Sequence, residues 1–192
     1  MSAPHLKPMS VEEYLRTEEA SPFKREYVGG YVYPLHGSTR AQAGATDGHI
    51  QIGVNFIFAL YTAAQQKGCR IYPSDMKLRI ERTNTFYYPD VMVVCDIRSG
   101  RETTFHTAPC LLVEVISKST ASVDRHAKYA AYTAIPSLQT YLIVEQDKRL
   151  VYAYQRGPAG WISSELHGRG EVAIPCLDIT VSLDQIYQSL DL

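Results

Sequence analysis

Short runs of hydrophobic residues in the middle of the chain predict the strands of a buried β-sheet. Residues 87–95 and 110–116 are rich in valine and leucine and are bounded by turn-forming residues. Continuous apolar runs of this length are typical of strands that are covered on both faces. Residues 141–144 and 150–154 have a similar composition, and we expect these two segments to pair across the polar turn between them.

The spacing of hydrophobic residues predicts helices on either side of these strands. Ser10, with Glu13 three residues later, indicates the start of a short helix that ends before Pro22. A longer helix is predicted over residues 47–66, and another over residues 123–134. The apolar positions with helical spacing in the longer helix are Ile50, Val54, Ile57, Phe58 and Tyr61.

Shorter segments complete the pattern of elements. Residues 26–34 contain a Gly-Gly turn between two apolar segments, which predicts a hairpin, and residues 69–72 and 76–80 predict strands. A β-rich tail closes in a short helix from Ser182. This order favours an α/β (α+β) fold, with a mixed central β-sheet flanked by helices and with extra β-hairpins. No repeat or linker divides the chain, so a single domain over residues 1–192 is expected.

The composition excludes several classes of protein. Hydrophobic residues make up 45% of the chain and charged residues 20%, which is typical of a folded globular domain. No apolar run approaches the ~18 residues of a membrane span, and the N-terminus lacks the apolar core of a signal peptide, so a cytoplasmic protein is expected. The formal net charge of −1 attracts no nucleic acid globally, and such binding would need a local basic patch.

The cysteines give little indication of a metal site. Cys69, Cys95, Cys110 and Cys176 are widely spaced and form no Cys-x-x-Cys motif. Two of them lie inside the apolar strands, where a free thiol packs as a small hydrophobic group. We therefore expect structural thiols rather than a zinc site.

Two carboxylates interrupt the apolar strands. Asp90 lies near the start of its run, and Glu114 lies near the end of the next one. An ionised carboxylate is rarely buried without a partner or a metal, because its desolvation costs so much free energy. If the two strands pair antiparallel, the start of one lies beside the end of the other. Both carboxylates could then reach one divalent cation at the same edge of the sheet.

Each candidate residue also has an ordinary structural explanation. Asp90 could accept hydrogen bonds in a turn, and Glu114 could form an internal salt bridge. Lys128 could pair with the acidic residue four positions before it, as is common on helices. Glu26 and His49 could be surface or capping residues. The case for a functional site therefore depends on the combination.

The order of polar residues around the two acidic strands is more specific than any one of them. The residues that carry the pattern are Glu26, Gly29, Gly30, His49, Pro89, Asp90, Glu114, Val115, Ile116, Ser117, Ser119, Thr120, Asp124, Lys128, either Tyr129 or Tyr132, Ile135 and Pro136. This pattern closely resembles the Uma-two family of restriction-endonuclease-like proteins, within the PD-(D/E)XK nuclease superfamily. The resemblance covers a core of about residues 9–187, and its strand, strand, helix order is the most specific part.

The chain departs from the simplest superfamily motif at one position. Ile116 stands where the lysine of a Glu-x-Lys motif would be. In the Uma-two pattern the following helix supplies the lysine instead, and Lys128 matches that place. Lys118 replaces a proline that is common in the family, and it offers a second candidate cation.

The resemblance implies a metal-dependent endonuclease that hydrolyses phosphodiester bonds in DNA. Its cofactor would be Mg²⁺ (or Mn²⁺), held by Asp90, Glu114 and the backbone carbonyl of Val115. Lys128 would orient the attacking water or stabilise the developing negative charge. Glu26 would complete the acidic cluster.

The resemblance also implies residues that contact the nucleic acid. His49 would support the metal ligands or face a phosphate, and Lys118, Arg125 and His126 would contribute basic contacts to the backbone of the DNA, or of RNA if that is the substrate. A homodimer is expected, because a small nuclease must cut two strands.

Two other functions stay open from the sequence. A nuclease fold without activity could serve as a nucleic-acid-binding or assembly module, which the near-neutral charge and the lack of an evident target-recognition domain favour. An enzyme acting on another phosphodiester or on a small nucleotide is the third possibility.

Overall fold

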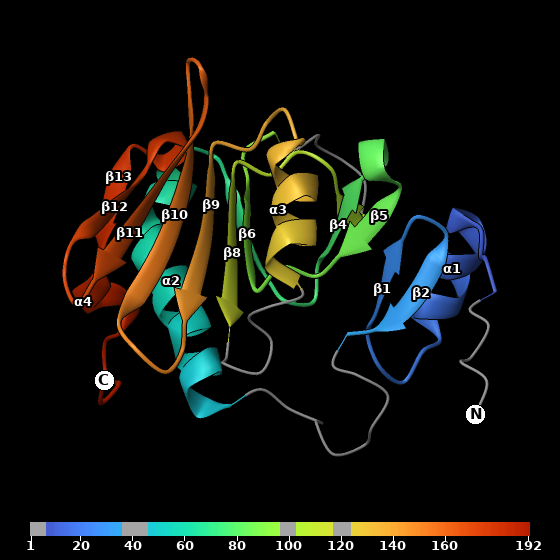
Figure 1. Cartoon of the computed structure of the whole chain (residues 1–192), viewed down its shortest axis with the longest axis horizontal. Coiled ribbons are helices and arrows are strands. Elements are labelled where there is room, and N and C mark those ends of the chain that lie inside the picture. Colours follow the sequence, from blue (N-terminus) through green and yellow to red (C-terminus); the bar gives the residue numbers. More distant parts are fainter. Residues whose placement is uncertain (1–6, 36–45, 97–102, 117–123) are drawn as a thin grey trace.

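The computed structural model describes residues 7–35, 46–96, 103–116 and 124–192 (Figure 1). Its helices are α1 (Val11–Glu19), α2 (Asp47–Gln66), α3 (Asp124–Thr133) and α4 (Leu183–Ile186), with short 3-10 helices η2 (Glu81–Thr83) and η3 (Pro175–Leu177). Its strands are β1 (Arg25–Val28), β2 (Tyr31–Pro34), β3 (Arg70–Pro73), β4 (Lys77–Ile80), β5 (Thr85–Tyr87), β6 (Val91–Val94), β7 (Phe105–His106), β8 (Leu111–Ile116), β9 (Thr140–Glu145), β10 (Leu150–Gly157), β11 (Gly160–His167), β12 (Glu171–Ile174) and β13 (Ile179–Ser182).

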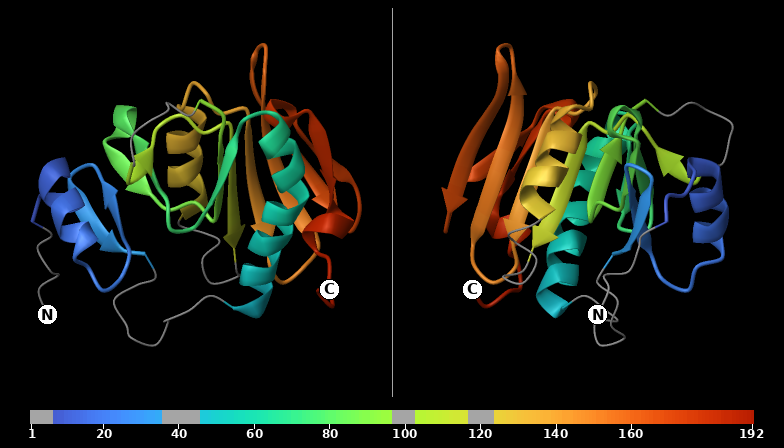
Figure 2. Two further views of the ribbon diagram at one scale, coloured as in Figure 1. Left: turned by 180° about the vertical axis from the view of Figure 1, so that it is seen from behind. Right: turned by 45° about the vertical axis from the view of Figure 1, so that its right-hand side comes forward.

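A six-stranded mixed sheet forms the centre of the molecule, in the order β11-β10-β9-β8-β6-β3. Strands β8 and β9 run parallel, whereas the other neighbours in this sheet are antiparallel. Helix α2 lies on one face of the sheet and α3 on the other (Figure 2). The predicted α/β (α+β) class, with a mixed central sheet between helices, is confirmed.

Strand β8 shows how the sheet serves two cores. Leu111, Val113 and Val115 pack in the cluster that includes α2, whereas Leu112 and Ile116 pack in the cluster that includes α3. This alternation is the two-residue period of an extended strand. It directs the even-numbered side chains of β8 towards α3.

A second sheet, β2-β1-β5-β4-β7, carries the N-terminal hairpin. Helix α1 packs on it through an aromatic group formed by Tyr14, Tyr27 and Phe86. Ser10 caps α1 by accepting a hydrogen bond from the backbone N–H of Glu13, as the sequence predicted. Residues from β4 and β5, including Tyr87, join the cluster on the α3 side of the central sheet. The hairpin therefore lies on the same side of the central sheet as α3.

The apolar run over residues 87–95 is not one strand, which corrects the prediction. Tyr87 ends β5 in the second sheet, and Val91 begins β6 in the central sheet. Pro89 lies between them, and it has no N–H with which to continue a strand ladder. The connection from β6 to β8 contains a short strand, β7, which pairs with β4. Residues 117–123, which include the predicted start of the helix at residue 123, lie outside the described residues.

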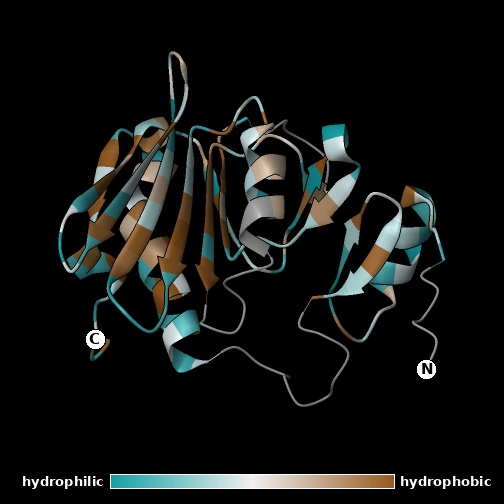
Figure 3. Ribbon diagram, in the orientation of Figure 1, coloured by the Kyte–Doolittle hydropathy of each residue, from teal (hydrophilic) through white to brown (hydrophobic). Residues whose placement is uncertain are grey.

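Helix α2 has the predicted bounds but buries a different face. Ile52, Phe56, Leu60 and Ala64 are buried against the central sheet. The exposed positions include four of the five residues named from the spacing, namely Ile50, Val54, Phe58 and Tyr61. The helix is apolar on two sides, so spacing alone could not identify the side that packs. Figure 3 shows that hydrophobic residues are concentrated on the central strands that this helix covers. None of the described helices is long and apolar enough to cross a membrane.

The cysteines converge, contrary to the expectation of separate structural thiols. Cys69 is disulfide-bonded to Cys95, and Cys110 is disulfide-bonded to Cys176. Strands β3 and β6 pair antiparallel, with Arg70 opposite Val94, and this places Cys69 beside Cys95. Wide spacing in the sequence concealed this convergence, because strand pairing joins segments that are far apart in the chain.

Candidate active site

Asp90 lies at the entrance of β6 and is held by the neighbouring strand. Strands β6 and β8 are antiparallel, with Val91 opposite Val113. The backbone N–H of Val115 donates a hydrogen bond of 2.7 Å to Asp90 Oδ2, so the aspartate side chain continues the pairing of β6 with β8 beyond the first residue of β6. The start of β6 and the end of β8 thus meet, as the sequence predicted.

His49 holds the second oxygen of Asp90. It lies in the first turn of α2, where its backbone N–H donates to the side chain of the capping residue Thr46. Its Nε2 is 3.0 Å from Asp90 Oδ1. This hydrogen bond raises the pKa of His49 above its ordinary value, and the opposing effect of burial is smaller. The contact therefore favours a protonated imidazole.

Glu114 points from β8 towards α3, where two side chains contact it. The hydroxyl of Tyr132 donates to Glu114 Oε1 at 2.6 Å, and Lys128 Nζ donates to Glu114 Oε2 at 3.3 Å. Lys128 and Tyr132 are four residues apart on a helix and so lie on the same face. Glu114 is 7% exposed and Lys128 is 6% exposed, so this ion pair is buried.

Lys128 also connects the second sheet to the site. Its Nζ lies 3.3 Å from Glu26 Oε1, which extends from β1. The same amine lies 5.4 Å from the centre of the Tyr87 ring, a distance suited to a cation–π contact. One buried cation therefore binds two carboxylates and an aromatic face.

The electrostatics of the site concentrate on Glu114. Burial raises the pKa of Glu114 from 4.5 to about 7. Lys128 and the Tyr132 hydrogen bond oppose this shift, whereas the negative charges of Asp90 and Glu26 add to it. Near pH 7, the Glu114 carboxyl is therefore present in both its protonated and its ionised form.

The structure brings together five of the residues predicted from the sequence. Glu26, His49, Asp90, Glu114 and Lys128 are joined through the contacts above. Lys128 forms buried contacts with the two glutamates, whereas the side chain of the acidic residue four positions before it lies outside what the structure describes.

Three other predicted residues are not placed by the structure. Lys118 lies outside the described residues. Arg125 and His126 belong to α3, but the positions of their side chains lie outside what the structure describes.

Two aromatic residues of the site were missed or left ambiguous. Tyr132 was named only as an alternative to Tyr129, and its spacing of four residues from Lys128 would have selected it. No pattern in the sequence indicated that Tyr87 belongs to the site, because Tyr87 lies in the second sheet and meets Lys128 only in the folded structure.

A divalent cation fits the donor set of this site. Asp90 and Glu114 offer hard oxygen donors, and each carboxylate oxygen can accept more than the one hydrogen bond described here. The carbonyl of Val115 lies on the same strand edge as its N–H, facing Asp90. The raised pKa of Glu114 reflects a cost of ionisation in this pocket, which a cation would reduce.

Comparisons with known proteins agree with this geometry. The model of the Uma2 family, described as "Putative restriction endonuclease", matches residues 11–185. Uncharacterized protein slr1290 of Synechocystis sp. is 34% identical over 190 residues, covering 98% of this chain and 96% of the relative. Uncharacterized protein sll1609 of the same strain is 33% identical over 165 residues, covering 84% of this chain and 89% of the relative.

A solved structure has the same fold at low sequence identity. It is described as a putative nuclease belonging to DUF820 from Anabaena variabilis, and it covers 93% of this chain and 97% of its own length with a TM-score of 0.70. At 14% identity this likeness concerns the fold alone. Together with the family match and the two relatives, it shows that the chain belongs to the Uma2 (Uma-two) family and has a nuclease-like fold.

Proposed function

We propose that this chain is a metal-dependent endonuclease that hydrolyses phosphodiester bonds in DNA, with Mg²⁺ or Mn²⁺ as its cofactor. The observation that carries the proposal is the meeting of Asp90, Glu114 and Lys128 where β6 begins and β8 ends. Asp90, Glu114 and the carbonyl of Val115 would hold the ion. Its chemistry is the activation of water and the neutralisation of charge on the scissile phosphate.

The side chains of the site are suited to these tasks. Asp90 is oriented from two sides, by His49 and by the backbone of Val115, so its oxygens need little reorganisation on binding. Glu114 gives up its proton as a cation binds, which makes binding stronger as the pH rises through about 7. Lys128 supplies a fixed positive charge beside Glu114, where negative charge develops during phosphodiester hydrolysis.

Contacts to the nucleic acid come from the basic residues around the site. His49 favours the protonated form, which suits a phosphate oxygen. Lys118, Arg125 and His126 belong to the same proposal as basic residues that follow β8 in the sequence, the last two in the first turn of α3. Such contacts position the backbone of the substrate and carry no sequence preference of their own.

A homodimer completes the proposal, because one chain supplies one site and a duplex has two strands. The exposed apolar stripe of α2 supports a self-complementary contact. Ile50, Val54, Phe58 and Tyr61 are spaced to lie on one side of the helix, and Phe58 is 83% exposed. Light scattering coupled to size-exclusion chromatography should give twice the chain mass for the native protein and the chain mass for Phe58→Lys. A native monomer at assay concentrations would remove the homodimer from the proposal.

Cleavage of defined substrates tests the catalytic proposal. Plasmid, linear duplex, single-stranded DNA, RNA and a small phosphodiester are incubated with Mg²⁺, Mn²⁺ or EDTA. We expect metal-dependent cleavage of DNA that Asp90→Asn and Lys128→Met abolish. Asp75→Asn is the matched control, because the side chain of Asp75 is 83% exposed and takes no part in the contacts of the site described above.

Calorimetric titration with Mn²⁺ provides an independent reading of the same site. Asp90→Asn should weaken Mn²⁺ binding at least tenfold, whereas Asp75→Asn should leave it unchanged. If Asp90→Asn alters neither Mn²⁺ affinity nor DNA cleavage, the metal-nuclease proposal must be abandoned.

One observation favours the alternative of an inactive nuclease fold that serves as a binding or assembly module. Lys128 already contacts both glutamates, and both oxygens of Asp90 have protein partners. Such a site is satisfied electrostatically to a large extent without an ion. Under this alternative, Asp90→Asn would raise thermal stability while neither the native protein nor the variant binds Mn²⁺.

A further inference from the structure

The four cysteines gather at the opposite end of the strands that carry the acidic site. Asp90 precedes β6 and Cys95 follows it, whereas Cys110 precedes β8 and Glu114 lies near its other end. Cys69 follows the end of α2, and Cys176 lies in η3 between β12 and β13. Four segments of the chain thus contribute one sulfur each to the cluster.

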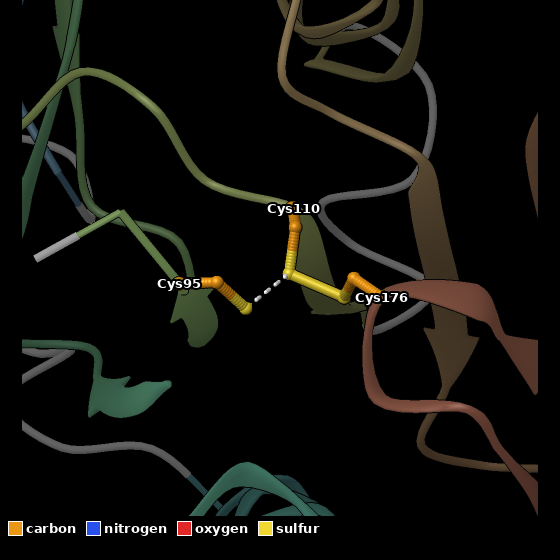
Figure 4. A group of neighbouring side chains, drawn as sticks. All are labelled: Cys95, Cys110 and Cys176. Carbon is orange, nitrogen blue, oxygen red and sulfur yellow. Dashed lines mark hydrogen bonds between the residues drawn. A yellow bond between two sulfur atoms is a disulfide. The ribbon is translucent and has the colours of Figure 1, made fainter. Parts of the chain in front are cut away.

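The sulfur atoms of this cysteine cluster are close across its two disulfides. The Sγ atoms of Cys95 and Cys110, which belong to different disulfides, are 3.5 Å apart (Figure 4). The Sγ atoms of Cys95, Cys110 and Cys176 all lie within 4.8 Å of one another. Cys69 joins them through its bond to Cys95. The two disulfides therefore form one cluster of sulfur atoms.

The spacing matches what a thiolate-bound metal requires. Tetrahedral zinc holds sulfur at about 2.3 Å, which separates neighbouring ligand sulfurs by about 3.8 Å. The 3.5 Å between the sulfurs of Cys95 and Cys110 is close to this value, and the sulfur of Cys176 lies within 4.8 Å of both. Once the disulfides are reduced, the sulfurs of each bonded pair, Cys69–Cys95 and Cys110–Cys176, would separate to the same spacing around the ion. Thiolates are soft ligands and select zinc rather than the hard Mg²⁺ that suits the carboxylates of the acidic site.

Burial of the cluster is also suited to a structural metal. Cys69 and Cys110 are buried in the core on the α2 side of the central sheet, and Cys95 and Cys176 are partly exposed beside it. The partly exposed pair gives a path for the ion, and the buried pair protects it. A metal there would tie the end of α2, the central strands and the β12–β13 ribbon to one point.

We propose that Cys69, Cys95, Cys110 and Cys176 form a zinc site in the reduced protein, and that the two disulfides are its oxidised, metal-free form. Each disulfide accepts two electrons and two protons from one molecule of a dithiol reductant, which becomes a cyclic disulfide. The four thiols then release four protons as they bind one Zn²⁺. The site is independent of the acidic site in both ligands and metal.

The experiment measures zinc in protein that has been treated with a dithiol and then exchanged into metal-free buffer containing a phosphine reductant. After addition of a slight excess of Zn²⁺ and desalting in EDTA, elemental analysis should find close to one zinc ion per chain. Replacement by Co²⁺ should give the sulfur-to-metal charge-transfer absorption and visible bands of tetrahedral thiolate coordination. Removal of zinc by a stronger chelator under reducing conditions should lower the melting temperature.

Variants separate this site from the acidic one. Cys176→Ser should reduce the zinc content at least tenfold, and Cys69→Ser should do the same from the other side of the cluster. The double variant Asp90→Ala/Glu114→Ala should retain all of its zinc. Zinc that survives Cys176→Ser but disappears with the acidic double variant would overturn the proposal.

Two results with the unmodified chain would overturn it as well. One is a reduced, folded protein that binds neither Zn²⁺ nor Co²⁺ and whose four thiols all react rapidly with an alkylating agent. The other is a protein whose disulfides resist dithiols until it unfolds, because the cysteines would then be permanent covalent cross-links. Both measurements are independent of whether any variant folds.

Discussion

Replacing Glu114 by glutamine should remove most of the pH dependence of stability that arises from the acidic site. Glutamine has the shape of a protonated glutamate and can still accept the hydrogen bond from Tyr132. In the native protein, burial raises the pKa of Glu114 to about 7, while the unfolded chain has the ordinary value of 4.5. Between these two pH values the folded state holds a proton that the unfolded state has lost.

The size and sign of the effect follow from this difference in pKa. Stability falls with increasing pH wherever the folded state binds more protons, so the native protein loses stability between pH 4.5 and 7. Each pKa unit corresponds to about 1.4 kcal/mol, so the loss amounts to about 3 kcal/mol when complete. Glu114→Gln escapes this loss. The variant should exceed the free energy of unfolding of the native protein by under about 1 kcal/mol at pH 5 and by about 3 kcal/mol at pH 8.

Urea unfolding measures the difference in unfolding free energy between Glu114→Gln and the native protein. The experiment is done in EDTA at constant ionic strength, at several values of pH between 5 and 8. Glu19→Gln is a suitable control, because it makes the same chemical change at an exposed position on α1. A difference for Glu114→Gln that is flat within about 0.5 kcal/mol, or that decreases with pH, would refute the argument from burial.

Three further changes test the packing around the site. Lys128→Met removes the buried cation and leaves Glu114 facing other carboxylates. The variant should lose about 3–5 kcal/mol of unfolding free energy at pH 8, measured by urea unfolding. A loss under about 1 kcal/mol would contradict the buried ion pair. Tyr132→Phe should cost about 1–3 kcal/mol, more at pH 8 than at pH 5, because the lost hydrogen bond stabilises the ionised carboxylate; an equal loss at both values would contradict this reason. Phe56→Ala should cost about 3–5 kcal/mol of unfolding free energy, whereas Phe58→Ala should cost under about 0.5 kcal/mol, since only Phe56 is buried. Both losses are measured by thermal unfolding at protein concentrations low enough for the chains to be monomers. Equal losses would contradict the assigned face of α2.

The fold could be predicted where the hydrophobic pattern that defines a helix or strand lies within that one element. The bounds of α2 agree with the spacing of its apolar residues, and β8 agrees with its continuous apolar run. The division between β5 and β6 was not predictable from hydrophobicity, because both strands are buried and only residues 88–90 separate them. The packing face of α2 was ambiguous for a similar reason, since apolar residues occupy two of its sides.

The candidate site was predictable to the extent that local geometry determines it. The antiparallel pairing of β6 and β8 follows from the order of the strands, and it placed Asp90 beside the end of β8. The role of Tyr87 and the gathering of the cysteines depend on how distant segments meet in three dimensions. No spacing along the chain records such contacts, so the structure was needed to find them.

The register of strand β8 determines which of its side chains enter the core and which enter the site. Its odd positions fill the core under α2, and its even positions present Glu114 to Lys128 and Tyr132 on α3. One residue inserted between Leu111 and Glu114 would exchange the two sets, placing the carboxylate in the apolar core and a core residue in the site. The length of β8 is therefore as much a part of the site as the residues that it carries.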